Sequence, residues 1–237
     1  MAKMTLKALR GGQGRVRLRR ACAVFLGVAC CAAALALPVR DAGAQNARDI
    51  VREVQRRYDD TREYSADFRQ ITEYRTLNRR VDGEGRVFLS KPAKMLWRYQ
   101  EPAGQFVLSD GKHLYFYQPA ERQVIKTALG SVFRSDLPLS FLLGIGDLAR
   151  DFRAELMDPT DDGHRLKLLP RKANSGIREI QLTVYRDSYD FRQVLIEDGG
   201  GNRWTFRFEN IQHGVNIDPA LFQLDVPQGV DIVEFGS

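Results

Sequence analysis

Cysteine is scarce in this sequence, and the positions of the few cysteines limit the thiol and disulfide chemistry that is available. The three cysteines, Cys22, Cys30 and Cys31, all lie within the first 44 of the 237 residues. A chain cut after Ala44 would therefore have neither a disulfide nor a reactive thiol. Gly27 stands at the third position before Cys30, where an acylated cysteine would have a large aliphatic residue, and Cys31 is preceded by Cys30, so lipid attachment at either is the weaker alternative.

Histidine and the common catalytic motifs are also missing or sparse. His113, His164 and His213 do not have the four-residue helical spacing of a zinc pair. The sequence has no Gly-x-Ser-x-Gly elbow, Walker loop or dinucleotide fingerprint. The acidic run at 158–163 lacks the alternating ligands and distal glutamate of a calcium loop, and it is more typical of a turn. We expect no enzymatic activity, no cofactor and no metal.

Excess positive charge is confined to the N-terminal region. The first 44 residues carry eight Lys and Arg against one acidic residue, whereas the remaining 193 carry 28 against 29. Sequence-independent binding to nucleic acid needs a broad basic face, which a nearly neutral body does not supply. Nucleic acid is therefore not an expected partner.

The N-terminal region has the order of a secretory signal. A basic run up to Arg20 precedes the apolar stretch 21–37, and Ala42-Gly43-Ala44 forms a small-x-small cleavage site. The apolar stretch is shorter than the roughly 20 residues of a spanning helix, which disfavours an uncleaved anchor. We predict a cleaved signal peptide at 1–44, export from the cytoplasm, and a single domain at 45–237.

The body begins with a helical pattern and continues as strands. Ile50, Val51, Val54 and Tyr58 follow helical spacing over about 46–60. The period then changes to two at Tyr64, and Gly, Pro and Asp-rich turns separate the apolar runs that follow. The predicted strands are 64–68, 82–90, 94–100, 105–109, 112–117, 122–127, 153–158, 164–169, 177–185, 190–198, 203–210 and 223–226.

One segment interrupts the strands. The compact apolar stretch 135–152 has Pro138 at a plausible helix start and Gly144 at a plausible stop, which predicts one or two short helices. About eleven short strands with short connections indicate a mainly β, antiparallel meander with a few helices. A barrel-like sheet would limit its exposed edges.

Large apolar side chains on both faces of the strands are the most informative feature. The strand 114–117 (Leu-Tyr-Phe-Tyr) is apolar on both sides, so each face of the sheet needs a cover. Loose covering by the helices would leave an apolar cavity, although plain core packing is the alternative for any single residue. Either Leu114 and Phe116 or Tyr115 and Tyr117 would face it. The candidate lining residues are Met95, Trp97, Tyr99, Phe106, Leu108, Leu114, Phe116, Leu139, Phe141 and Leu142.

The chain resembles a known family over about 46–230. The residues that carry the resemblance are Ser90-Lys91-Pro92, Met95-Leu96-Trp97, Pro102, the hairpin 107–112, 114–117, the Pro138-led segment, and the stretches 64–70, 218–222 and 227–230. Together they resemble the periplasmic outer-membrane lipoprotein carriers of the LolA type. The resemblance implies an open antiparallel half-barrel with a short helical lid over an apolar cavity for acyl chains.

The resemblance also implies partners and a latch. Such a carrier is a monomeric chaperone that takes acylated lipoproteins from an inner-membrane ABC-type releasing transporter to an outer-membrane lipoprotein acceptor. The family often has an arginine that holds the lid shut, and here that position is Lys91. Lysine offers three donors on a flexible stem in place of a planar fork. The implied lid partners lie near Tyr58, Leu142 and Leu143.

Three other functions stay open on sequence alone. The outer-membrane acceptor shares the fold but is itself a lipoprotein. The same fold could also carry or sense another envelope lipid. A hydrolase using Asp110 or Glu101 is the third alternative, but no second acid or base is marked beside either residue.

Overall fold

The structure is a computed structural model that describes residues 46–132, 147–161, 163–172, 176–226 and 228–235. Helix α1 (Ala47–Asp60) is followed by β1 (Glu63–Tyr74), β2 (Arg79–Ser90), β3 (Lys94–Glu101), β4 (Phe106–Asp110), β5 (His113–Gln118), η1 (Pro119–Glu121), β6 (Gln123–Ala128) and α2 (Leu129–Val132). The second half contains α4 (Leu148–Asp151), β7 (Phe152–Thr160), β8 (Gly163–Pro170), β9 (Ile177–Tyr185), β10 (Phe191–Asp198), β11 (Arg203–His213), η2 (Pro219–Phe222) and β12 (Asp231–Phe235).

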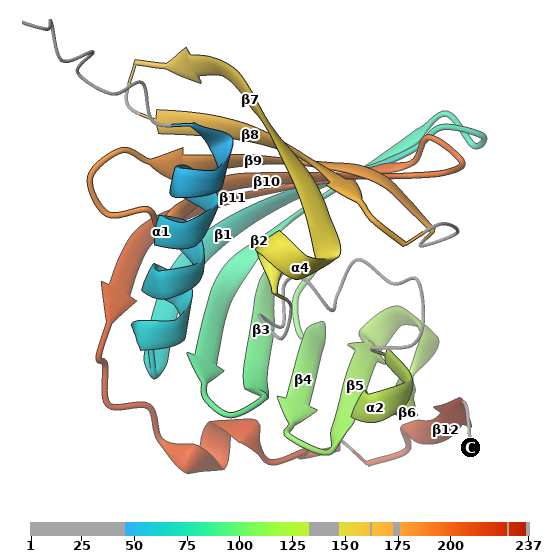
Figure 1. Ribbon diagram of the computed structural model, residues 1–237. Helices are drawn as coiled ribbons and strands as arrows, with labels where there is room; N and C mark the ends of the chain where they lie inside the picture. Colours follow the sequence, from blue (N-terminus) through green and yellow to red (C-terminus); the bar gives the residue numbers. More distant parts are fainter. Residues whose placement is uncertain (1–45, 133–146, 162, 173–175, 227, 236–237) are drawn as a thin grey trace, which may run out of the picture. The chain divides into compact units, whose positions relative to one another are not determined.

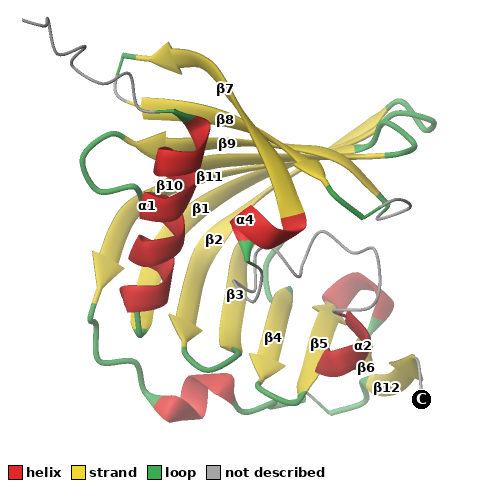
Figure 2. Cartoon of the chain, in the orientation of Figure 1, coloured by secondary structure: helices red, strands yellow, loops and turns green. Residues whose placement is uncertain are grey.

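The strands form one curved, open sheet (Figures 1 and 2). Its order is β12-β6-β5-β4-β3-β2-β1-β11-β10-β9-β8-β7, so β12 and β7 are edges and the sheet does not close. All pairs are antiparallel except β12 with β6, which are parallel. The predicted mainly β fold, an open antiparallel sheet with short helices, is confirmed.

Helix α1 lies over the concave side of the sheet (Figure 1). Asn46 caps its first turn by accepting a hydrogen bond from the Asp49 N–H at 3.0 Å. Ile50, Val51 and Val54 are buried against the sheet, as the helical spacing predicts. These side chains anchor residues 50–54 of the helix in the core.

Two apolar clusters cover the two faces of the sheet. The first lies under α1 and includes Trp97 and Leu114, with Phe116 packed against it. The second, which includes Tyr115, lies on the opposite face, and η2 packs there against β3 and β4. The two-sided strand β5 therefore divides as expected from its pattern: Leu114 and Phe116 lie on the face of the first cluster, and Tyr115 and Tyr117 on the face of the second.

The C-terminal region differs from its prediction. The predicted strand at 223–226 is wrong, because this stretch follows η2 as irregular chain, and Leu224 and Val226 pack against the second cluster. The last strand is instead β12, which adds to β6 and brings the described strands to twelve. Its residues are mostly exposed, so hydrophobic alternation gives no signal for it.

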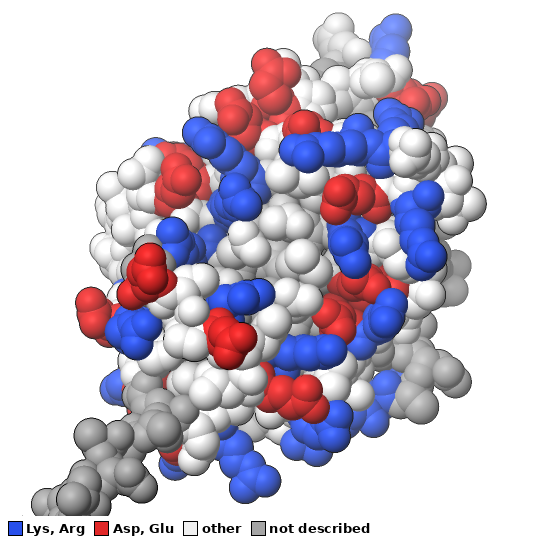
Figure 3. Space-filling model, turned by 90° about the horizontal axis from the view of Figure 1, so that it is seen from above, with Lys and Arg blue, Asp and Glu red and all other residues white. Residues whose placement is uncertain are grey.

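The predicted helical segment at 135–152 is described only in part. Helix α4 lies within it, whereas residues 135–146 lie outside the described residues. Over the described ranges, no helix combines the length and apolarity needed to cross a membrane. Figure 3 shows acidic and basic side chains interspersed over one face of the molecule, in agreement with the nearly neutral body.

Candidate functional site

The concave side of the sheet forms an aromatic floor beneath α1. Trp97, with 4% of its surface exposed, lies at its centre. Its ring is 4.6 Å from that of Phe68, 5.3 Å from Phe206 and 5.8 Å from Phe208, centroid to centroid. Phe68 also packs edge-on against Tyr99 at 5.0 Å. Strands β1, β3 and β11 thus contribute to one continuous apolar surface.

The polar atoms within this floor have partners inside it. Trp97 Nε1 donates to Met95 Sδ at 2.9 Å, and the Tyr99 hydroxyl donates to Gln70 Oε1 at 2.5 Å. Burial raises the pKa of Tyr99, which keeps its hydroxyl neutral. Because these groups are satisfied internally, the surface presented to a ligand is apolar.

A cavity of about 60 Å³ lies between the C-terminal half of α1 and this floor. The described residues that line it are Val54, Arg57, Tyr58, Thr61, Arg62, Tyr64, Val87, Leu89, Lys91, Trp97, Tyr189, Asp190, Phe191, Phe208 and His213. Its wall is mainly apolar, and several charged side chains stand around it. A volume of this size holds about four to six water molecules and no long acyl chain.

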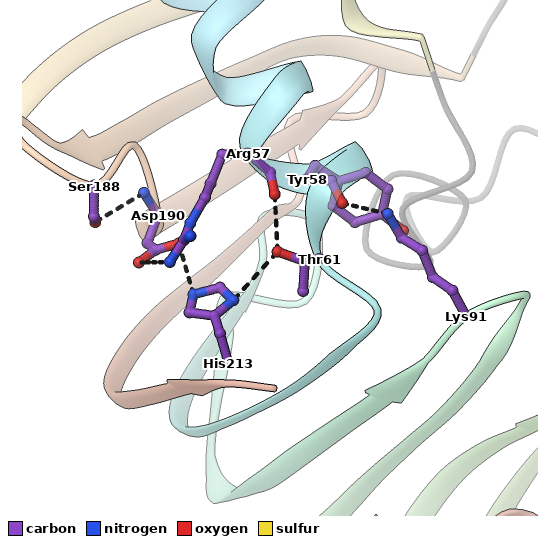
Figure 4. A network of polar contacts seen from close by, with 7 residues as sticks. All are labelled: Arg57, Tyr58, Thr61, Lys91, Ser188, Asp190 and His213. Carbon is purple, nitrogen blue, oxygen red and sulfur yellow. Dashed lines mark hydrogen bonds and ion pairs between the residues drawn. The ribbon is translucent and has the colours of Figure 1, made fainter. Parts of the chain in front are cut away.

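One flank of the cavity is formed by Lys91, in the turn between β2 and β3. Its ammonium donates to the carbonyl oxygen of Tyr58, lies 3.4 Å from that of Asp59, and stands 3.8 Å from the centroid of the Tyr58 ring (Figure 4). Burial lowers the pKa of Lys91, and the nearby Asp59 and Asp60 carboxylates counteract part of that effect. Burial also raises the pKa of Tyr58. Lys91 therefore holds the last turn of α1, where the i→i−4 hydrogen bonds of the helix end.

The other flank is a polar network on β11 and the β9–β10 turn (Figure 4). Arg57 Nε donates to Asp190 Oδ1 at 2.8 Å. His213 Nε2 lies 2.9 Å from the same oxygen, and His213 Nδ1 lies 3.2 Å from Thr61 Oγ1. The hydrogen bond to Asp190 raises the pKa of Arg57, partly offset by burial. The end of α1 is thus held on both sides of the cavity.

The structure separates the predicted cavity residues into three groups. Met95, Trp97, Tyr99 and Leu114 belong to the cluster beneath α1, and Phe116 packs against it. Phe106 and Leu108 were expected on the same face, and that expectation is wrong. They pack in the cluster on the opposite face. Leu139, Phe141, Leu142 and Leu143 lie outside the described residues.

The error on β4 is a shift of one residue. Trp97 pairs with Val107, and Leu96 pairs with Leu108, so Val107 takes the position on the concave face. Every residue of β4 from Phe106 to Leu108 is apolar, and hydrophobicity therefore could not choose the register.

Several cavity residues were missed by the sequence reasoning. Val87 and Leu89 alternate on a predicted strand, and this period of two could have assigned them to one face. Asp190 and His213 carry no such signal, because they meet Arg57 only through the pairing of distant strands. Their role depends on tertiary structure alone.

The carboxylate of Asp110 has a structural role in the β4–β5 turn. Oδ1 accepts from the Lys112 and His113 N–H groups, each at 2.7 Å, and Oδ2 accepts from the Tyr115 hydroxyl at 3.0 Å. Burial alone would raise the pKa of Asp110, but these hydrogen bonds outweigh it and the pKa is lowered. Within the described part of the chain, no cluster of three His, Cys, Asp or Glu could hold a metal ion.

Comparison with known proteins gives consistent results. The model of the family described as "Outer membrane lipoprotein carrier protein LolA" matches residues 59–225. The outer-membrane lipoprotein carrier protein of Chromohalobacter salexigens is 30% identical over 174 residues, which cover 73% of this chain and 81% of that protein. The outer-membrane lipoprotein carrier protein of Alkalilimnicola ehrlichii is 28% identical over 224 residues, which cover 94% of this chain and 98% of that protein.

The fold also has a solved counterpart. An uncharacterized conserved protein from Thermus thermophilus matches with a TM-score of 0.51 and 14% identity, over 80% of this chain and 99% of that one. At this identity the similarity concerns the fold alone.

Proposed function

The chain belongs to the family of outer-membrane lipoprotein carrier proteins, the LolA family, and from that premise we propose that it holds the acyl chains of lipoproteins in the cavity beneath α1. The family consists of transport chaperones and not enzymes. The observation that most supports the proposal is the aromatic floor around Trp97, whose polar atoms are satisfied internally and over which α1 lies. Such a surface favours long apolar ligands.

The proposed lining residues come from both the sequence and the structure. Met95, Trp97, Tyr99, Leu114 and Phe116 are the sequence candidates that lie on the concave side. The structural additions are Val87, Leu89, Val107 and Phe208. Phe106 and Leu108 are left out of the proposal because they face the other way.

Loading must enlarge the cavity. A space for a few waters cannot receive an acyl chain, so the described arrangement corresponds to a closed cavity. The helix α1 forms one wall and is held at its last turn by contacts with Lys91 and Asp190. We propose that movement of this end of α1 opens the cavity.

Carriers of this family are periplasmic, which sets the proposed route. We propose that residues 1–44 are a cleaved signal peptide and that 45–237 form the carrier domain. The domain would take lipoproteins from an inner-membrane ABC-type transporter and deliver them to an outer-membrane acceptor. Mass spectrometry of the purified N-terminus tests this assignment: Gln45 as first residue supports it, and a diacylglyceryl cysteine at position 30 or 31 would identify an acceptor lipoprotein.

Photocrosslinking from two neighbouring positions on β2 tests cargo binding. Leu89 packs against the cluster beneath α1, and Phe88 against the cluster on the other face, and both are half-buried. A photoreactive amino acid at position 89 is expected to give adducts with acylated lipoproteins in living cells, whereas the same group at 88 gives none. Equal adducts at both positions, or none at 89, would refute binding in this cavity.

A further inference from the structure

The last turn of α1 is held from two sides by chemically different contacts. Lys91 reaches main-chain carbonyls and the ring of Tyr58, while Arg57 reaches Asp190 through its side chain (Figure 4). Arg57 and Tyr58 are consecutive, and neighbouring helix positions point about 100° apart. The helix end therefore spans the cavity with one anchor on each flank.

The geometry of the Arg57–Asp190 pair is favourable. Nε and Nη2 of Arg57 donate to Oδ1 and Oδ2 of Asp190 at 2.8 and 3.3 Å, which is a two-point contact. The Asp190 side chain is only 11% exposed, and that of Arg57 is 37% exposed. Solvent therefore screens this pair less than an ion pair on the open surface.

The turn between β9 and β10 fixes the carboxylate in place. The Asp190 N–H donates to Ser188 Oγ at 3.2 Å, and the Asp190 carbonyl accepts from the Tyr185 N–H at 3.0 Å. Tyr189 adopts φ +58° and donates its own N–H to the Tyr185 carbonyl at 3.0 Å. A turn with these bonds presents Asp190 as a fixed acceptor.

His213 and Thr61 complete a ring of contacts back to the helix. The Thr61 hydroxyl donates to the Arg57 carbonyl at 2.8 Å, so its only hydrogen is already used. The contact between Thr61 Oγ1 and His213 Nδ1 is then donated by the ring nitrogen. His213 Nε2 lies 2.9 Å from Asp190 Oδ1 without the geometry of a hydrogen bond. The ring joins α1, the β9–β10 turn and the end of β11.

The buried apolar side chains of α1 end at Val54, so polar contacts hold the last turn of the helix. Its fully buried side chains, Ile50, Val51 and Val54, all lie within residues 50–54 of the helix. Beyond residue 54, the polar contacts among the described residues include Gln55, which accepts from the Leu148 N–H at 3.1 Å, and those of Arg57 and Tyr58. The C-terminal end can therefore move without exposing residues 50–54.

We infer that Asp190, fixed in place by the β9–β10 turn, is a second latch that holds α1 closed through Arg57, independent of Lys91. The inference rests on the proposed carrier function, and it adds a requirement to it: loading breaks an ion pair as well as the contacts of Lys91. Both latches stabilise the empty state, so each lowers the apparent affinity for acyl chains.

The test compares Arg57→Gln and Asp190→Asn with the matched control Arg56→Gln. Arg56 is the neighbouring arginine on α1, and its partner is Glu53 on the same helix. The full chain is expressed in cells and purified. Hydrogen exchange of α1 amides reports opening, and fluorescence of the neutral apolar probe N-phenyl-1-naphthylamine reports cavity binding.

Exchange over residues 55–60 is expected to be about three- to tenfold faster in both latch variants, with probe binding tighter by a similar factor. Exchange over 47–54 should not change. Arg57→Lys should show a smaller increase in exchange and probe binding than Arg57→Gln, because lysine keeps the positive charge but lacks the planar guanidinium that makes the two-point contact. Combined with Lys91→Met, the factors should multiply, since separate latches add in free energy.

Two negative results can be told apart. If the native protein binds the probe but Arg57→Gln and Asp190→Asn behave like Arg56→Gln, the latch inference is overturned and the carrier function stands. If the native protein binds no probe and position 89 gives no lipoprotein adducts, the carrier function itself fails. An effect of Asp190→Asn that spreads equally over all of α1 would show a general loss of stability and would also overturn the latch.

Discussion

Replacing Lys91 by methionine removes the donors and the charge of the first latch but keeps an unbranched side chain. The native ammonium donates to the Tyr58 carbonyl and stands 3.8 Å from the centroid of the Tyr58 ring. A hydrogen bond from a charged donor contributes about 1.5–3 kcal/mol, which half-exposure reduces to about 1–2. The ring contact adds about 0.5–1 kcal/mol. The closed state should thus lose about 2 kcal/mol.

This loss has a measurable consequence for binding. When the closed state predominates, apparent affinity rises by the factor through which that state is destabilised. About 2 kcal/mol corresponds to roughly 30-fold, since 1.4 kcal/mol is tenfold. Titration with N-phenyl-1-naphthylamine should therefore show binding about 10- to 30-fold tighter in Lys91→Met, and stopped-flow release should be slower.

The matched control is Lys112→Met, which removes an exposed lysine in the β4–β5 turn. It changes the net charge by the same amount and should leave probe affinity at the native value. If Lys91→Met binds the probe within twofold of Lys112→Met, the contact does not stabilise the closed state. The same result would refute the reasoning that Lys91 limits affinity.

Further variants test the floor, the sheet and the β4–β5 turn. Trp97→Ala should cost about 3–5 kcal/mol of unfolding free energy in urea, because it removes the centre of the floor, whereas Leu156→Ala at a half-exposed site should cost little. Gly85→Ala should destabilise by about 1–3 kcal/mol, because its Cβ would overlap the Arg98 carbonyl oxygen on the neighbouring strand, and an unchanged urea midpoint would contradict that contact. The lowered pKa of Asp110 adds stability that is present above about pH 4 and is lost as pH falls through the native value, so Asp110→Asn should flatten the acid limb of a pH–stability curve; an unaltered limb would exclude this source.

The sequence predicted which side chains of a strand face the cavity only where one of its two alternating sets of side chains was apolar. On β3, Met95, Trp97 and Tyr99 alternate with Leu96, Arg98 and Gln100, and the aromatic set does lie beneath α1. On β4 both registers are apolar, and the turn at 102–105 determines which one is used. Pairing of Trp97 with Val107 follows from that turn and not from hydrophobicity.

The contact between Lys91 and the helix end could be predicted from the sequence, whereas the contact between Arg57 and Asp190 could not. Lys91 and the helix end at Tyr58 came from a family pattern, and the structure places them in contact. Asp190 meets Arg57 across 133 positions of sequence, through the antiparallel order β1-β11-β10-β9. No spacing rule links residues so far apart, because their proximity depends on three strand pairings at once.

The latches and the floor have opposing effects on affinity, and a carrier needs both. Each buried methylene contributes about 0.8 kcal/mol, so a long acyl chain in an apolar cavity would gain on the order of 10 kcal/mol and leave slowly. The closed cavity, with room for only a few waters, offers none of that gain until α1 moves. The two latches, with factors of about 10- to 30-fold and three- to tenfold, would together weaken apparent binding by a factor on the order of 100, and re-forming them would favour release. Unidirectional transfer would then depend on how strongly an empty carrier closes as well as on how strongly its floor binds.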